Sequence, residues 1–393
     1  MKRLLIIGAS ILQLPAIKLA KELGYYVGVI DYDPNAVGIP YADKYFNVST
    51  IDIDGVTQTA KEFNPDGIMT LATDMPMRSI ARACEELGLH GISFDTAIKS
   101  TDKGEMIKAF EANGVEHPWY FILSSPDELG GVMDKISFPC VSKPTDNSGS
   151  RGVMLIHNAE ELTEAVAYSS QNGRGGSVII EEYLKGPEVS VEIITIDGQP
   201  HVLNVTDKLT TGAPHFVEMG HSQPSRLGAE NVEKIKDLAI RAVRSVGIQD
   251  GPAHVEIMLT ENGPRMVELG ARMGGDCITT HLVPLSTGIN MMEATMRIAC
   301  GEAPDIERKF EKGSAIRYFN PPVGIIRDIR GAEDAMKLEG VREISFTKKI
   351  GDRVGSIGSS TDRVGFVIAQ ADTAEDAIRI CERVCDTVEI VTE

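Results

Sequence analysis

Apolar stretches of strand length alternate with helical stretches over about the first 95 residues, and this alternation constrains the fold more than any other feature. Leu4–Ile7 and Tyr26–Ile30 have the composition of buried strands, and Leu14–Leu23 between them has helical spacing. The alternation continues to the helical stretch Met75–Leu87. Strands that alternate with helices favour a parallel sheet covered by helices. We therefore predict an α/β fold whose first domain, residues 1–100, has a Rossmann-like arrangement.

A different pattern begins near Ser100. A helix is predicted over Asp102–Ala112, and a strand over Phe138–Lys143 leads into a Gly-rich loop at 144–152. From about Gly313, short strands and two helices are typical of a smaller α+β domain. We expect a division into residues 1–100, 101–312 and 313–393, with the Gly-rich loop in a subdomain of about 115–185.

The charge balance limits the class of partner. Asp and Glu number 57 against 39 Lys and Arg, which gives a net charge of −18. Such a chain is a poor match for nucleic acid or an anionic membrane. The six cysteines have neither metal nor disulfide spacing, and no apolar run has the length of a membrane span. We therefore expect a cytoplasmic protein that acts on small molecules.

Two glutamates on adjacent predicted strands indicate a metal site. Ala253–Thr260 and Pro264–Leu269 are predicted to form a hairpin around a three-residue loop centred on Asn262. In that register Glu256 and Glu268 face each other about 5 Å apart and repel unless a cation lies between them. Carboxylate oxygens suit Mg²⁺ or Mn²⁺. The alternative is a solvated hairpin face that tolerates the repulsion. The opposite face is expected in the core, with Val255, Ile257, Val267 and Leu269.

The first turn of the chain raises a second possibility, dinucleotide binding. Gly8 follows the first strand and Asp31 ends the second, as in proteins that bind nicotinamide cofactors. However, Ser10 and Gln13 stand where the fingerprint needs glycines, so the backbone could not approach a pyrophosphate closely. A nicotinamide-dependent dehydrogenase is therefore the weaker alternative. The others are a Rossmann-like scaffold in which Asp31 merely ends a strand, and one whose crevice holds a different small substrate.

Two segments have features of a phosphate and nucleotide site. Lys143 ends a strand beside the Gly-rich loop, whose backbone N–H groups could hold phosphates. The segment Glu181–Glu188 follows an apolar strand, so its backbone could pair with an adenine edge and Glu188 could accept ribose hydroxyls. The alternatives are a surface loop for the first segment and a charged edge strand for the second.

Further along the chain, Arg272 lies four residues after Glu268. An arginine there could stabilise charge on a transferring phosphoryl group or a tetrahedral oxyanion, or form a salt bridge to one of the glutamates. Glu218 and His221 lie in a stretch without regular pattern, where a single histidine is more often a surface residue.

Taken in order, these elements resemble the ATP-grasp superfamily of carboxylate–amine ligases. The resemblance spans essentially the whole chain. It is strongest for the L-amino acid ligase and carnosine synthase branch, because of Phe216–His221, Ala271–Asp276 and Ser360–Gly365. The elements that carry the wider resemblance are Asp102-Lys103, Val141–Pro144, the Gly-rich loop, Glu181–Glu188, the Glu256/Glu268 hairpin and Arg272.

The resemblance implies an ATP-grasp fold and an ADP-forming reaction that joins a carboxylate to an amine through an acyl phosphate. It implies ATP and Mg²⁺ (or Mn²⁺) as cofactors, and homodimers are common in the superfamily. The implied metal ligands are Glu256 and Glu268, and the implied catalytic residues are Arg272, Glu218 and His221. The implied ATP-binding residues are Lys103, Lys143, the loop residues Ser148, Gly149, Ser150 and Gly152, and Glu181, Leu184 and Glu188.

Two positions leave the prediction open. Asp276 falls near the amino-acid substrate in this branch, where it could attract an ammonium group, but it could equally cap the helix that follows. Gly270 stands where many members have an Asn that binds the second metal. Gly270 favours the alternative of a non-catalytic nucleotide-binding protein. Other ATP-grasp reactions, as in phosphoribosylglycinamide synthetase or biotin carboxylase, are a separate alternative.

Overall fold

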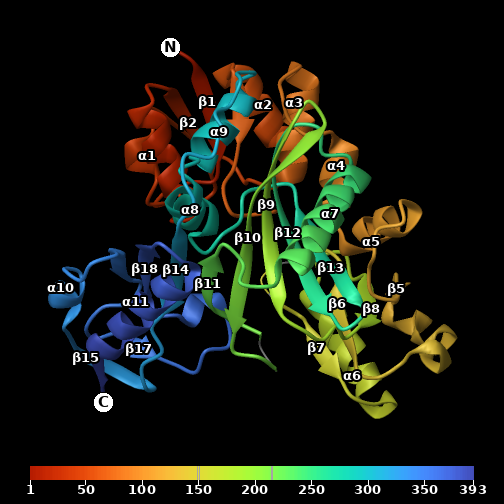
Figure 1. Ribbon diagram of the computed structural model, residues 1–393. Coiled ribbons are helices and arrows are strands. Elements are labelled where there is room, and N and C mark those ends of the chain that lie inside the picture. Colours follow the sequence, from red (N-terminus) through yellow and green to blue (C-terminus); the bar gives the residue numbers. More distant parts are fainter. Residues whose placement is uncertain (148, 150, 214–215) are drawn as a thin grey trace.

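The computed structural model describes residues 1–147, 149, 151–213 and 216–393, which form an α/β molecule with four sheets (Figure 1). The N-terminal sheet is parallel and has the order β3-β2-β1-β4, so the predicted parallel sheet is confirmed. Its strands are β1 (Arg3–Ile7), β2 (Tyr26–Asp31), β3 (Lys44–Asn47) and β4 (Gly67–Met69). Its helices are α1 (Leu14–Glu22), η1 (Ile39–Tyr41), α2 (Ile53–Phe63), α3 (Met77–Leu87) and α4 (Phe94–Lys99).

The first βα turn is filled by the protein itself. The Gln13 side chain is buried, and its Nε2 donates to the Leu71 carbonyl at 2.7 Å. Its Oε1 accepts from Ser10, and a Cβ on Gly8 would lie only 2.8 Å from that oxygen. The Asp31 carboxylate accepts from the Ala9 backbone N–H at 2.7 Å. Gln13 and Asp31 therefore hold the turn closed, which argues against the dehydrogenase alternative.

A second, antiparallel sheet has the order β5-β8-β6-β7 and carries the Gly-rich loop between β6 and β7. Its strands are β5 (Tyr120–Leu123), β6 (Cys140–Pro144), β7 (Met154–Ile156) and β8 (Val178–Glu182). The associated helical segments are α5 (Lys103–Ala112), η2 (Pro126–Gly131), η3 (Met133–Lys135) and α6 (Ala159–Asn172). The Asp102 carboxylate caps α5 by accepting from the Gly104 and Glu105 N–H groups, which fixes Lys103 at the first position of the helix.

The largest sheet has eight strands in the order β13-β12-β9-β10-β11-β14-β18-β16. It runs without a break across the domain boundary expected at residue 313. Its strands are β9 (Glu188–Ile196), β10 (Gln199–Thr210), β11 (Glu218–Gln223), β12 (Gly251–Thr260), β13 (Gly263–Gly270), β14 (Gly313–Tyr318), β16 (Val341–Phe346) and β18 (Gly365–Ala371). The helical segments between β11 and β14 are α7 (Ala229–Val246), η4 (Ile278–Leu282), α8 (Val283–Thr287) and α9 (Met291–Ala299).

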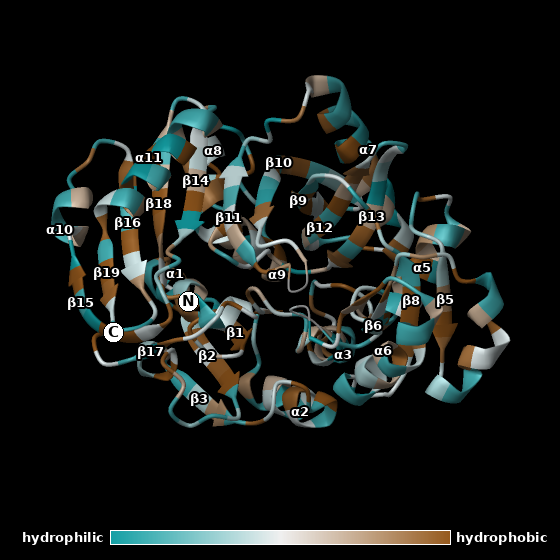
Figure 2. Cartoon of the chain, turned by 90° about the horizontal axis from the view of Figure 1, so that it is seen from below, coloured by the Kyte–Doolittle hydropathy of each residue, from teal (hydrophilic) through white to brown (hydrophobic). Residues whose placement is uncertain are grey.

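The C-terminal part adds α11 (Ala374–Thr387), whose Ala377 and Cys381 pack in one core with Ala315 and Val367 of the large sheet. A small sheet, β17-β15-β19, lies beside it. The remaining elements are β15 (Gly324–Arg330), α10 (Ala332–Ala335), β17 (Arg353–Val354), η5 (Ser360–Asp362) and β19 (Glu389–Thr392). Hydrophobic residues concentrate on the strands, for example β2 and β18 (Figure 2).

Helix α9 returns to the N-terminal domain and joins its core. Met291 and Met296 of α9 are fully buried in a cluster with Leu4 and Ile6 of β1. At Gly67 of β4 a Cβ would lie 2.6 Å from the Ala299 backbone, so this contact needs glycine. The N-terminal domain is thereby packed directly against the part that carries the hairpin. Within the described residues, no helix combines the length and apolarity needed to cross a bilayer.

Candidate active site

The hairpin β12–β13 presents Glu256 and Glu268 as direct cross-strand partners, so the predicted pair is confirmed. The predicted loop is wrong. Thr260 pairs with Gly263, which leaves a two-residue loop. The register then shifts between Glu256 and Ile257, because β13 carries a bulge. The extra bulge residue compensates for the shorter loop and brings the two glutamates face to face.

The bulge also changes which side chains enter the core. Ile257 pairs with Met266, which is 1% exposed, whereas Val267 is half-buried and lines a cavity beside Glu268. The prediction that Val267 belongs to the core was therefore wrong. Its side chain forms part of the wall of the site instead.

Each glutamate has a cationic neighbour. The Lys103 Nζ lies 2.9 Å from Glu268, and the Lys208 Nζ lies 3.2 Å from Glu256. On the other side, His254 Nε2 lies 3.2 Å from the same Glu256 oxygen. Burial alone would raise the pKa of Glu256, but Lys208 and His254 hold it well below its ordinary value. Glu256 is therefore held as a carboxylate, the form that can bind a cation.

Lys208 on β10 is a site residue that the sequence analysis missed. Its side chain is only 4% exposed and also lies 2.5 Å from Glu188 and 3.6 Å from Glu218. Although burial acts in the opposite direction, these carboxylates hold the pKa of Lys208 well above its ordinary value. One ammonium group thus stands among three carboxylates. Only the pairing of β10 with β9 could have indicated Lys208. Asp207 pairs with Val189, so the neighbouring Lys208 comes to lie beside Glu188.

His254 was also missed. Its Nδ1 lies 2.9 Å from Glu192, a fully buried carboxylate that also accepts from Ser190. Burial lowers the pKa of His254, but Glu192 and Glu256 outweigh it and raise the pKa to about 9. A Cβ on Gly274 would lie 2.6 Å from His254 Nδ1. Gly274 therefore makes room for this histidine.

A cavity of about 180 Å³ lies between the second sheet and the large sheet. It collects most of the side chains assigned to ATP and metal, together with apolar walls formed by Val141, Val153 and Met258. Lys143 and Glu181 are both buried there, and their charged groups lie 2.5 Å apart. The predicted residues that line this cavity are Lys103, Lys143, Gly149, Glu181, Leu184, Glu188, Glu218, Glu256 and Glu268.

Among the described loop residues that were predicted, Gly152 does not line this cavity. Gly152 has a positive φ of 80°, and a Cβ there would lie 2.8 Å from Asn172, so it serves the packing of the loop against α6. Ser148 and Ser150 lie outside the described residues.

Arg272 forms a salt bridge, but with neither hairpin glutamate. Its Nε and Nη2 donate to the two carboxylate oxygens of Asp74 at 2.8 and 3.1 Å, so the N-terminal domain holds this guanidinium. Burial acts against the charged form, but Asp74 outweighs it and raises the pKa of Arg272. The pair also accounts for Gly270, since a Cβ there would lie 2.7 Å from Asp74 and 3.1 Å from Arg272. An Asn side chain at position 270 would therefore not fit beside the Asp74–Arg272 pair.

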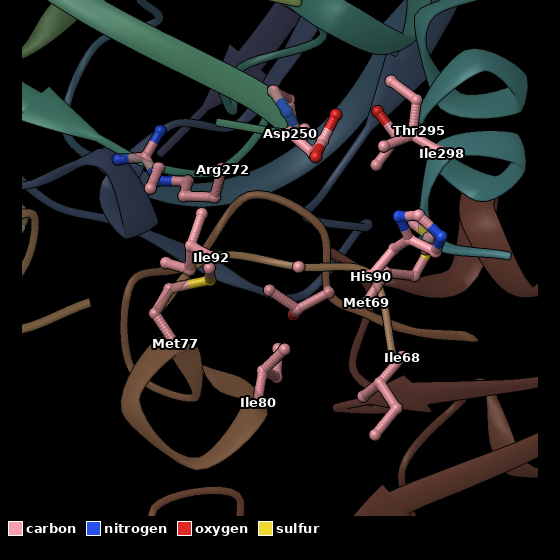
Figure 3. Close-up of a pocket in the computed structure, with 16 residues that line it drawn as sticks. Ile68, Met69, Met77, Ile80, His90, Ile92, Asp250, Arg272, Thr295 and Ile298 are labelled. Carbon is pink, nitrogen blue, oxygen red and sulfur yellow. The ribbon is translucent and has the colours of Figure 1, made fainter. Parts of the chain in front are cut away.

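Behind Arg272 lies a small apolar cavity of about 60 Å³ (Figure 3). Figure 3 shows Arg272 at one side of it and His90 at the other. Its walls come from the N-terminal domain, the start of β12 and α9, and include Ile68, Met77, Ile80, Ile92 and Ile298. Arg272 thus lines a cavity where the N-terminal domain meets β12 and α9.

Asp276 and His221 belong to a cluster that reaches into the C-terminal domain. The Asp276 carboxylate accepts two hydrogen bonds from Arg363, at 2.7 and 2.8 Å, and lies 3.3 Å from His221 Nε2. The Arg363 guanidinium stacks 3.8 Å above the Tyr318 ring. His221 is 1% exposed, so the expectation of a surface histidine was wrong. The capping alternative for Asp276 is also wrong, because the following helix has no side-chain cap.

Asp276→Asn is expected to lower the free energy of unfolding by about 1.5–3 kcal/mol, because Arg363 loses a charged, bidentate partner. Burial would raise the pKa of Asp276, but Arg363 and His221 hold it well below its ordinary value. A depressed pKa contributes stability above the ordinary value of about 4 and loses it only in stronger acid. Urea unfolding at neutral pH measures the loss. Asp372→Asn is the control, because the Asp372 side chain is 93% exposed. Equal stability of the two variants would contradict a stabilising role for the Asp276–Arg363 pair.

Two protein families match this chain. The ATP-grasp domain matches residues 136–280, and the L-amino acid ligase C-terminal domain 2 matches residues 317–393. The chain is an ATP-grasp ligase. The two matches include the hairpin, Lys143 and Glu181 in the first, and Arg363 in the second.

Relatives and solved structures agree with this assignment. Alanine–anticapsin ligase of Bacillus subtilis is 25% identical over 74% of this chain, which spans 66% of that protein. The structure of an L-amino acid ligase from Bacillus licheniformis superposes with a TM-score of 0.86 at 25% identity, over 100% of this chain and 99% of that one. The structure of phosphoribosylglycinamide synthetase from Anaerococcus prevotii superposes with a TM-score of 0.82 at 25% identity, over 100% of both chains.

The residues of this ATP-grasp ligase fit a divalent cation. Glu256 and Glu268 supply carboxylate oxygens from adjacent strands. In this structure Lys208 neutralises the charge of Glu256, and Lys103 that of Glu268. Within the described part of the chain, no three His, Cys, Asp or Glu side chains form a closed metal cage. That is the donor set expected for Mg²⁺, which is usually held by one or two carboxylates together with substrate phosphates and water.

Proposed function

We propose that this ATP-grasp ligase joins a small carboxylate, such as an amino acid, to an amine through an acyl phosphate, with release of ADP and phosphate. The observation that carries the proposal is the facing pair Glu256 and Glu268 at the cavity that also holds Lys103 and Lys143. The match of residues 317–393 to the L-amino acid ligase C-terminal domain favours this reaction over other ATP-grasp reactions.

In the proposed complex the adenine lies between the apolar walls beside Leu184, and the phosphates reach Lys143 and Lys103. Glu181 contributes backbone groups to the adenine edge, and Glu188 accepts ribose hydroxyls while Lys208 holds it in place. The polar and apolar lining of this cavity supports that orientation. The loop residues Gly149 and Gly152, with Ser148 and Ser150, would cover the phosphates.

Glu256 and Glu268 would hold Mg²⁺ or Mn²⁺, which neutralises charge on the γ-phosphoryl group when bound. Arg272 would stabilise the charge that develops on the acyl phosphate and the tetrahedral intermediate. Its fixed orientation by Asp74 supports that role, because an arginine already held in place loses little freedom in the transition state. Glu218 and His221 would act on the substrate side, with Asp276 behind His221.

A screen for phosphate release with Mg-ATP and pairs of amino acids and small amines tests the proposal. We expect release of ADP and phosphate only when both a carboxylate and an amine are present, with formation of the coupled product by mass spectrometry. Turnover only with phosphoribosylamine and glycine, or only with bicarbonate, would assign one of the alternative reactions. Nucleotide binding without ADP formation under every combination would indicate a non-catalytic protein.

A further inference from the structure

A second cavity, of about 280 Å³, adjoins the nucleotide cavity. The two share Lys103, Asn147 and Glu268, so the second cavity opens at the phosphate end of the proposed ATP site. Its other walls come from the N-terminal domain and from the chain that follows α6. None of its lining residues was identified from the sequence except Lys103 and Glu268.

Arg78 of α3 is the distinctive group in this cavity. Its Nε donates to Thr101 Oγ1 at 2.8 Å, and the Thr101 hydroxyl donates in turn to the Ala97 carbonyl at 2.7 Å. The guanidinium is therefore fixed in orientation. Across the described residues, no carboxylate forms an ion pair with Arg78, although the chain has a net charge of −18. A fixed arginine without a carboxylate partner is suited to an anionic ligand.

The other charged groups around the cavity strengthen this preference. Arg174 also lines it, and within the described ranges its guanidinium has no ion pair. The acidic residues have donors of their own. Asp74 accepts from Arg272, Asp146 from the backbone N–H groups of Arg174 and Gly175, and Glu268 from Lys103. Among the described residues that line this cavity, the guanidinium groups of Arg78 and Arg174 are therefore the positive groups without a carboxylate partner.

Helix α3 adds to the positive potential at Arg78. The helix begins at Met77, and no side chain caps its N-terminus. Arg78 and Ser79 occupy its first turn, and the buried Ser79 hydroxyl has no hydrogen-bond partner in the described structure. Ser79 and Arg78 both line the cavity. The positive end of the helix dipole thus acts in the same direction as the guanidinium.

We propose that this cavity binds the amine substrate, and that this substrate is an amino acid whose own carboxylate pairs with Arg78. The inference rests on the proposed ligase function and specifies its second substrate. The ammonium first gives one proton to water. The amine nitrogen then bonds to the acyl carbon, the acyl C–O bond breaks with its electron pair going to phosphate, and the second surplus proton of the nitrogen also goes to water. The carboxylate on Arg78 is held away from phosphorylation and becomes the free carboxylate of the product.

The charge pattern favours a zwitterion over a phosphorylated ligand. The cavity has three cationic side chains, Arg78, Lys103 and Arg174, and three acidic ones, Asp74, Asp146 and Glu268. The carboxylate of a zwitterion meets the guanidinium groups of Arg78 and Arg174, and its ammonium meets Asp146, whose donors are backbone N–H groups. A phosphate dianion would instead add to the negative charge of the three carboxylates.

Binding of the twenty L-amino acids and their C-terminal amides, measured as a rise in melting temperature with Mg²⁺ and a non-hydrolysable ATP analogue present, tests the proposal. We expect at least one amino acid to stabilise the protein while its amide does not. Arg78→Gln should weaken that binding about 10- to 100-fold, because a charge-assisted pair is lost. Arg78→Lys should restore it only in part, since lysine lacks the bidentate fork.

Arg82→Gln is the matched control, since Arg82 lies one turn further along α3, is half-buried and pairs with Glu85. It should bind amino acids as the unchanged protein does. Equal binding of amide and amino acid, or unchanged binding in Arg78→Gln, would overturn the proposal. Stabilisation by inorganic phosphate but by no amino acid would overturn the carboxylate assignment. If an amino acid bound in an Arg78-dependent way but no pair of substrates gave turnover, the proposed ligase reaction would be refuted. The assignment of an amino-acid site at Arg78 would then still hold.

Discussion

Glu268→Gln is expected to remove most turnover and leave the protein folded. The substitution keeps the shape of the side chain and an oxygen that can accept from Lys103, which now lies 2.9 Å away. It removes one of the two negative charges proposed to hold the metal, so the γ-phosphoryl group loses its neutralising partner. We expect kcat to fall on the order of 10²–10³-fold. ADP formation with Mg-ATP and an accepted substrate pair measures the effect.

Glu261→Gln provides the control on the same hairpin, because Glu261 lies in the exposed two-residue loop. It should retain full activity and the same requirement for Mg²⁺. Titration with Mg²⁺ separates a metal role from a general defect, since loss of a ligand raises the Mg²⁺ concentration needed for any remaining activity. Near-normal activity of Glu268→Gln at limiting Mg²⁺ would refute the metal assignment.

The hairpin shows how a sequence prediction can be right about a site for an incomplete reason. A three-residue loop and a regular ladder predict the same partners as a two-residue loop with a bulge. The bulge is a property of the folded sheet and has no clear signal in the residues around Val267. The facing glutamates were therefore predictable, whereas the side chain that lines the cavity beside them was not.

Local order was predictable because it depends on spacing within short segments. The strand–helix alternation of the first domain, the α5 cap at Asp102 and the strand that ends near Lys143 all have local signals. By contrast, Asp74 and Arg272 are 198 positions apart, and Asp276 and Arg363 are 87 apart. Such pairs depend on how the domains pack, so the sequence could propose Arg272 and Asp276 but not the partners that hold them.

Lys208 was missed for a related reason. Strand β10 mixes polar and apolar residues over Gln199–Thr210, because one face meets the core and the other meets the cavity and its carboxylates. A lysine in such a stretch has the appearance of a solvated residue. Its burial follows only from the pairing of β10 with β9 and β11, which brings Glu188 and Glu218 to either side.

Lys208→Met is expected to lower the free energy of unfolding by about 3–5 kcal/mol, the usual effect of removing one partner of a buried charge cluster. The ammonium contacts Glu188, Glu256 and Glu218 at 2.5, 3.2 and 3.6 Å. Methionine fills a similar volume but removes the ammonium that the three carboxylates share, so that among the described residues only His254, beside Glu256, stays as their counter-charge. Guanidinium or urea unfolding measures the loss, with circular dichroism as the check that the variant is folded.

Two further variants decide whether charge is the cause. Lys234→Met removes an exposed lysine that pairs with Glu230 on α7, and a surface pair of this kind contributes at most about 0.5 kcal/mol. Adding Glu218→Gln to Lys208→Met removes one of the three facing charges, so the double variant should regain part of the lost stability. If Lys208→Met were no less stable than Lys234→Met, or if the second substitution destabilised it further, the carboxylates around Lys208 would not depend on its charge. Recovery in the double variant would show that Lys208 is the counter-charge that lets this cavity hold so many carboxylates before a metal ion arrives.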